Sequence, residues 1–133
     1  MAAVVAGTHS VFWSLLQSKK LSANALATFN QATLLGDPIY VASISVVETR
    51  YLEEKGKLQQ GTLARLTSAL EGNDSGLVLV PLDLSVAEAV EQIPREAVPD
   101  MPDRIIAATA LYLDLPLVTR DGKIKAAGIK TIW

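Results

Sequence analysis

The sequence contains no cysteine, which excludes disulfides, cysteine-ligated zinc sites and cysteine nucleophiles. It contains a single histidine, His9, which excludes a histidine-rich zinc site but still suffices for a Ser-His-Asp triad. Neither standard glycine-rich phosphate-binding loop is present. A metal site in this chain would therefore be built from oxygen ligands.

Strong charge and long apolar runs are also lacking. The formal net charge is -2, so nucleic-acid binding would need a local basic patch or a bound cation. No apolar run approaches the roughly 18 residues of a membrane span, and the start MAAVVAG lacks the basic region of a signal peptide. These features predict a cytoplasmic protein with no membrane partner. The length and the 50% hydrophobic content predict a single globular domain over residues 1–133.

Apolar runs of strand length alternate with segments of helix length. Strands are predicted at 3–6, 39–42, 77–82, 117–119 and 130–133, and the third is continuously apolar, as strands buried on both faces are. Helices are predicted at 8–17, 22–36, 45–55, 61–70, from 85, 103–113 and 122–127. This alternation predicts a three-layer α/β/α fold with a small, mostly parallel sheet. Sites in such folds lie beyond the carboxyl ends of the strands.

Three acids are placed near that edge: Asp121 after a strand, Asp103 at a helix start, and Glu48 one turn into a helix. Asp100 lies three residues before Asp103. Each has an ordinary alternative interpretation. Ser45 and Glu48 match a capping box, Asp103 suits a helix N-terminus, and Asp100 and Asp121 suit turns. Gathered in one cleft, however, carboxylates raise one another's pKa and require a neutralising cation.

Oxygen ligands alone select Mg²⁺ or Mn²⁺, and metal-dependent phosphodiester hydrolysis is the chemistry that fits. Arg104 and Arg120 flank the acids and are interpreted as phosphate contacts, with exposed helix-end cations as the alternative. Phe12 and Trp13 are interpreted as core or interface residues, and His9 as a polar residue at a helix start.

Five segments, in order and spacing, resemble a PIN domain, and within that family the small VapC-type toxins of prokaryotic toxin–antitoxin pairs. They are GTHSVFW, KLS, SISVVETRYLEEKGKL, DMPDRIIAATALYLDLPLVTRD and IKTIW, and they cover essentially the whole chain. The resemblance implies a Mg²⁺- or Mn²⁺-dependent endoribonuclease whose metal ligands are Glu48, Asp103 and Asp121. It implies supporting roles for Asp100 and Thr119 and an RNA contact at Thr8. It also implies a homodimer and a cognate antitoxin.

Gly7 departs from this pattern. The family's first acid, a direct metal ligand, is the Asp of an Asp-Thr-His triplet after the first strand, and here the triplet is Gly7-Thr8-His9. The change removes one negative charge and two ligand oxygens, so we expect an impaired catalytic site. An inactivating substitution, selected or engineered, and a naturally degenerate family member are the two explanations. The functional alternatives are a weakened toxin and a catalytically inactive PIN module that binds RNA or a protein.

Overall fold

The computed structural model describes residues 2–133, and within them five strands form one sheet in the order β3-β2-β1-β4-β5. Every pair of neighbouring strands is parallel, which confirms the predicted α/β class. The strands are β1 Val4–Ala6, β2 Ile39–Ala42, β3 Leu77–Val80, β4 Leu117–Val118 and β5 Thr131–Ile132. The helices are α1 Thr8–Leu15, α2 Ala23–Leu35, α3 Ser43–Glu54, α4 Thr62–Glu71, α5 Leu84–Ala89, the 3₁₀ helix η1 Val90–Gln92, α6 Met101–Leu113 and α7 Gly122–Ala126.

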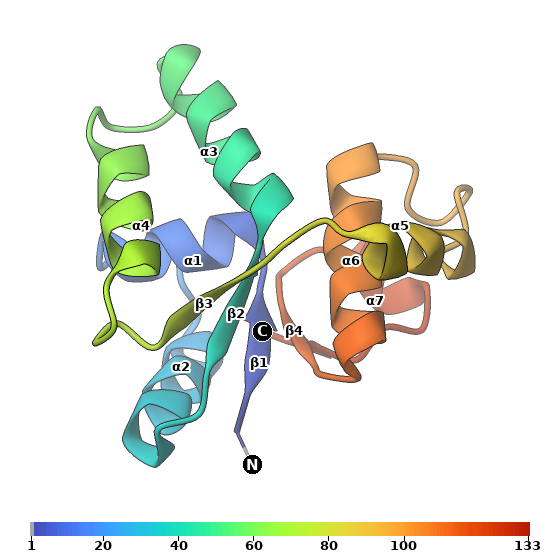
Figure 1. Cartoon of the computed structure of the whole chain (residues 1–133), viewed down its shortest axis with the longest axis horizontal. Coiled ribbons are helices and arrows are strands. Elements are labelled where there is room, and N and C mark those ends of the chain that lie inside the picture. Colours follow the sequence, from blue (N-terminus) through green and yellow to red (C-terminus); the bar gives the residue numbers. More distant parts are fainter. Residues whose placement is uncertain (1) are drawn as a thin grey trace.

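Helices cover both faces of the sheet, so the fold has three layers. Figure 1 shows α1 to α4 on one side of the strands and α5 to α7 on the other. Alternate residues of β1 enter the two cores: Val4 and Ala6 pack with Phe29 of α2, and Val5 packs with Ile106 of α6. In the part of the chain that the structure describes, no helix is long and apolar enough to cross a membrane.

Strand β3 lies at the edge of the sheet, and the prediction that it is buried on both faces is wrong. Val78 and Leu79 point to opposite faces, and their side chains are 42% and 43% exposed. An apolar run indicates strand structure, but it does not say whether a neighbouring strand lies on one side or on both. The order of strands decides that, and it depends on contacts distant in sequence.

Local caps fix several helix boundaries. The Ser22 hydroxyl accepts a hydrogen bond from the Ala25 amide at 3.0 Å, and Gly36 ends α2 in the left-handed conformation at φ +69°, as predicted. The sequence also suggests that Ser85 and Glu88 form a capping box at the start of the helix expected from residue 85. That expectation is wrong, because the Asp83 carboxylate caps α5 through the Val86 amide at 3.0 Å.

The alternative interpretation of Ser45 and Glu48 as a capping box is also wrong. Helix α3 begins two residues earlier, at Ser43, and its N-cap is Ala42, so Ser45 lies inside the first turn and is fully buried. Similarly, the helix expected from Asp103 begins at Met101. The earlier start of α3 leaves the side chains of Ser45 and Glu48 available for contacts across the fold.

Candidate functional site

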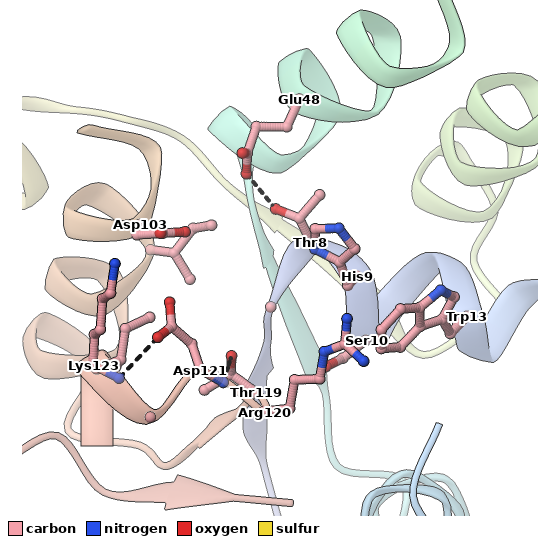
Figure 2. A pocket seen from close by; sticks show the side chains of 14 residues that line it. Thr8, His9, Ser10, Trp13, Glu48, Asp103, Thr119, Arg120, Asp121 and Lys123 are labelled. Atoms are coloured by element: carbon pink, nitrogen blue, oxygen red, sulfur yellow. Dashed lines mark hydrogen bonds between the residues drawn. The ribbon is translucent and has the colours of Figure 1, made fainter. Parts of the chain in front are cut away.

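A cavity of about 670 Å³ opens beyond the carboxyl ends of β1 and β4. Gly7 and Thr8 follow β1, and Thr119 and Asp121 follow β4, so the parallel sheet brings these two segments to one edge. Helices α3 and α6 add Glu48 and Asp103 to the lining (Figure 2). Three of the predicted acids, Glu48, Asp103 and Asp121, therefore share one cavity.

Asp103 projects from the first turn of α6. The Asp100 carboxylate caps this helix by accepting a hydrogen bond from the Asp103 amide at 3.3 Å, and Asp100 itself is exposed and does not line the cavity. Burial, followed by repulsion from Asp100, Asp121 and Glu48, raises the pKa of Asp103 to about 7. The cluster of acids is therefore unfavourable when all its members are ionised and no cation is present.

Glu48 is held in place by Thr8. The Thr8 hydroxyl donates to Glu48 Oε1 at 2.6 Å, and Thr8 Oγ1 also lies 2.9 Å from Ser45 Oγ. Burial raises the pKa of Glu48, the Thr8 hydrogen bond opposes that rise, and repulsion from Asp100 adds to it. Because Thr8 is only 5% exposed and its hydroxyl is engaged, its predicted role as an RNA contact does not fit, and it acts instead as a positioning residue for Glu48.

The turn after β4 places Asp121. The Thr119 hydroxyl oxygen accepts a hydrogen bond from the Asp121 amide at 3.1 Å, and Asp121 Oδ1 accepts one from the Lys123 amide at 2.9 Å. Asp121 is therefore both the cap of α7 and a wall of the cavity. The turn interpretation and the functional interpretation of Asp121 are compatible.

Ser10 is a cavity residue that the sequence analysis missed. The Val118 carbonyl oxygen, at the end of β4, accepts hydrogen bonds from the Gly7 amide at 2.9 Å and from the buried Ser10 hydroxyl at 2.8 Å. These bonds tie the start of α1 to the end of β4. No local signal in the sequence indicates a contact between residues so far apart.

The resemblance assigns the first acidic position to Gly7, and the backbone of this residue does not require glycine. Its φ of -66° and ψ of 162° are extended values that any residue adopts. A Cβ atom placed there would lie 3.1 Å from the Val118 carbonyl oxygen and 3.5 Å from Thr119 Cβ. A side chain at this position therefore requires the Val118 carbonyl to move by a few tenths of an ångström.

The donor set suits a hard divalent cation. Among residues 2–133 no three or more His, Cys, Asp or Glu side chains lie close enough together to form a preformed metal site. Mg²⁺, however, keeps several waters and is commonly bound by only one or two carboxylates. Burial, followed by repulsion from the neighbouring acids, raises the pKa of Asp103, and a bound cation would relieve that repulsion.

The two arginines predicted to contact phosphate have different surroundings. Arg104 does not line the cavity, because its guanidinium donates hydrogen bonds to the carbonyls of Val90 at 3.0 Å and Ile93 at 2.8 and 3.2 Å. Its interpretation as a phosphate contact is therefore replaced by a role in holding η1 against α6. Arg120 does line the cavity, and its Cζ lies 4.7 Å from the ring centre of Trp13.

Aromatic residues complete the cavity. Phe12 and Trp13 are buried, as predicted, and Trp13 also borders the cavity together with His9. Burial, followed by the nearby charges of Arg120 and Lys20, lowers the pKa of His9. The spacing of His9 and Trp13, four residues apart in a predicted helix, was the available signal that they share a face.

Comparisons with known proteins identify the family. A model of the PIN domain matches residues 9–130. Ribonuclease VapC22 of Mycobacterium tuberculosis is 29% identical over 126 residues, which are 95% of this chain and 92% of the relative. Among solved structures, a chain of VapBC2 from Rickettsia felis, bound to a DNA fragment from its promoter, superposes with a TM-score of 0.70 at 19% identity, covering 97% of this chain and 96% of the other. A chain of FitAcB from Neisseria gonorrhoeae superposes with a TM-score of 0.65 at 26% identity, covering 96% and 95%.

Proposed function

The chain belongs to the PIN domain family, and from that premise we propose that it is an endoribonuclease toxin of the VapC type, impaired by Gly7. The observation that carries the proposal is the single cavity lined by Glu48, Asp103 and Asp121 at the carboxyl edge of the sheet. The similarity to a protein named ribonuclease VapC22 over nearly the whole chain supports RNA as the substrate.

We assign the binding of Mg²⁺ or Mn²⁺ to Glu48, Asp103 and Asp121. When bound, such an ion neutralises the acids, acidifies water for attack on phosphorus and stabilises the charge that develops on the leaving oxygen. The protein supplies the orientation. Thr8 fixes the carboxylate of Glu48, and the Thr119 hydroxyl holds the turn that presents Asp121.

The remaining polar groups of the cavity serve the substrate. Arg120 and Lys123 place positive charge in a cavity that otherwise repels phosphate. We therefore propose that their side chains contact the phosphates of the RNA backbone. Without a cation, the proton that Asp103 retains near neutral pH relieves part of the repulsion among the acids. Proton binding at Asp103 and cation binding in the cavity therefore compete.

We also propose a homodimer and a cognate antitoxin as protein partners. Twelve large apolar side chains are exposed within residues 2–133, including Leu34 of α2 at 83% and Leu84 of α5 at 73%. Some of them adjoin in sequence, Leu34 with Leu35 in α2 and Leu111 with Tyr112 in α6, and grouped apolar side chains of this kind suit protein contacts. The similarity to a chain of the FitAcB assembly is consistent with such a partner.

The substitution Gly7→Asp tests the proposal. It should restore the missing carboxylate and raise Mg²⁺-dependent cleavage of RNA by roughly 100-fold or more, as expected for a direct ligand in a site that depends on charge. Gly7→Asn is the matched control, because it adds a similar volume beside Val118 without the charge. Absence of metal-dependent cleavage by purified, folded Gly7→Asp protein would defeat the nuclease proposal.

A catalytically inactive PIN module that binds RNA or a protein partner is the second candidate. The observation in its favour is the loss of the first acid while the other three acids, the fold and the cavity persist. The two candidates differ in one outcome. Both allow RNA binding by the unaltered chain, but only the inactive module predicts no gain of cleavage in Gly7→Asp.

A further inference from the structure

Trp133 does not line the cavity, but it contacts a residue that does. Its indole packs against that of Trp13, with ring centroids 6.0 Å apart and an interplanar angle of 53°. Trp13 in turn carries the guanidinium of Arg120, whose Cζ lies 4.7 Å from the ring centroid (Figure 2). We propose that Trp133 is a positioning residue that holds Arg120 in the cavity wall through Trp13. This inference rests on the proposed function, in which Arg120 contacts the RNA backbone.

Arg120 is a residue that gains from such support. It is exposed, and an unsupported arginine side chain samples many rotamers, which it must give up when it binds a phosphate. The face of an indole ring attracts a guanidinium and limits these rotamers before the substrate arrives. The direction of the Arg120 side chain therefore depends on where the ring of Trp13 lies.

The ring of Trp13 is held by contacts from two parts of the chain. Within α1, His9 and Phe12 contact it, with ring centroids 5.3 and 6.0 Å away. Trp133 adds a contact from beyond β5, and the ring of Trp13 is left only 6% exposed. Without the indole of Trp133, the ring of Trp13 would have open space on that side and could rotate away from Arg120.

Trp133 is itself fixed by its neighbours. Its half-buried side chain packs against the core that contains Val4 and Ala6, and its carbonyl oxygen accepts a hydrogen bond from Asn24 Nδ2 of α2 at 3.3 Å. The preceding residue, Ile132, accepts a hydrogen bond from the Thr119 amide at 3.1 Å. Strand β5 therefore fixes the backbone next to Arg120 and, through Trp133, the ring beneath its guanidinium.

NMR spectroscopy observes the position of Arg120 without RNA or metal. A guanidinium over an indole face resonates upfield of a solvated one, so the Nε–H signal of Arg120, assigned with Arg120→Lys, should be shifted in the unaltered chain. Trp133→Ala should abolish this shift, and Trp133→Phe should keep most of it. Tyr112→Ala, which removes an exposed aromatic ring of α6 outside the cavity, is the matched control and should leave the signal in place. An unchanged Arg120 signal in folded Trp133→Ala would overturn the inference.

A double-mutant cycle links this position to RNA binding. The unaltered chain and its variants are titrated in EDTA with a short, fluorescently labelled RNA. Trp133→Ala should weaken binding by roughly 2- to 5-fold, the factor that corresponds to one exposed cation–π contact. Arg120→Ala should weaken it at least as much, and the double variant should bind no more weakly than Arg120→Ala alone, because Trp133 acts through Arg120. Additive losses, or full affinity in Arg120→Ala, would overturn the inference.

The two proposals can fail separately. In the Gly7→Asp background, Trp133→Ala should raise KM for RNA by the same roughly 2- to 5-fold and change kcat by less than about twofold, because Arg120 binds the substrate and the acids perform the chemistry. If Gly7→Asp cleaves no RNA, the nuclease proposal fails, and the Arg120 signal and the binding cycle still decide the role of Trp133.

Thermal melting identifies a variant that does not fold. If Trp133→Ala is such a variant, Trp133→Leu carries the comparison, because leucine fills part of the space against the core but brings no ring against Trp13. Trp133→Leu should lose the Arg120 shift that Trp133→Phe keeps, and equal Arg120 signals in the two variants would overturn the inference.

Discussion

At the scale of single residues, the site depends on side chains whose roles differ from those that their local sequence indicates. Ser45 and Glu48 read as a capping box, but the Thr8 hydroxyl reaches Glu48 across 40 positions of sequence. Asp100 reads as a turn residue or a second acid, and it is the cap of α6. Glu48 is bound by a residue that is distant in sequence, and Asp100 caps a helix that begins earlier than expected. In both cases the local sequence does not reveal the role of the side chain.

Thr8 should matter through Glu48 and not through RNA. In the Gly7→Asp background, Thr8→Val removes the hydroxyl that holds the carboxylate, and we expect metal affinity to fall by roughly 10- to 100-fold, as for other groups that orient metal ligands. Thr8→Ser keeps the hydroxyl and should lose little. Titration with Mn²⁺ measures the affinities, and equal losses in both variants would contradict this role.

Asp103 should make stability depend on pH. Its folded pKa of about 7 lies above the ordinary value near 3.9, so its proton favours the folded state. That stabilisation is fully present below about pH 4 and is lost as the pH rises through about 7. Asp103→Asn removes this titrating group. In EDTA the melting temperature of the variant should therefore exceed that of the parent at about pH 8, whereas at about pH 4 the two should be similar.

Thermal melts of both proteins across this range provide the measurement. Added Mg²⁺ should narrow the difference at high pH, because the ion stabilises the ionised carboxylates of the parent. A difference in melting temperature that stays constant from acid to alkaline pH would show that Asp103 does not titrate as described.

At the scale of elements, most of the fold is predictable from sequence, because periodicity and caps are local. The strands, the Ser22 cap and the Gly36 stop are local features of this kind. The burial of β3 and the partner of Arg104 were mispredicted, because both depend on which elements become neighbours. For the same reason the sequence placed three acids at one edge of the sheet but left Ser10 unrecognised.

Arg104 should support the packing of η1 on α6. Arg104→Met removes the donors that satisfy the Val90 and Ile93 carbonyls, and we expect a loss of about 1–3 kcal/mol of unfolding free energy. The exposed Arg95, in the loop between η1 and α6, is a matched control. Arg95→Met should change the free energy of unfolding by less than about 0.5 kcal/mol. Chemical denaturation measures both, and similar effects of the two substitutions would contradict the assignment.

At the scale of the whole molecule, the site exists because the sheet places β1 between β2 and β4. That order brings the ends of β1 and β4, the start of α3 and the start of α6 to one edge, so residues from four parts of the chain line one cavity. Two apolar cores, one on each face of the sheet, hold this frame, and Gly7 belongs to neither of them. A cavity with three acids and space for a fourth is the central claim of this account.

Calorimetric titration of Mn²⁺ into the unaltered chain, Gly7→Asp and Gly7→Asp/Asp121→Asn tests that claim most directly. We predict weak binding by the unaltered chain, affinity at least roughly tenfold higher for Gly7→Asp, and loss of that gain when Asp121 is also neutralised. Equal Mn²⁺ affinity in the unaltered chain and in folded Gly7→Asp would contradict the account, because position 7 would then not belong to the metal site.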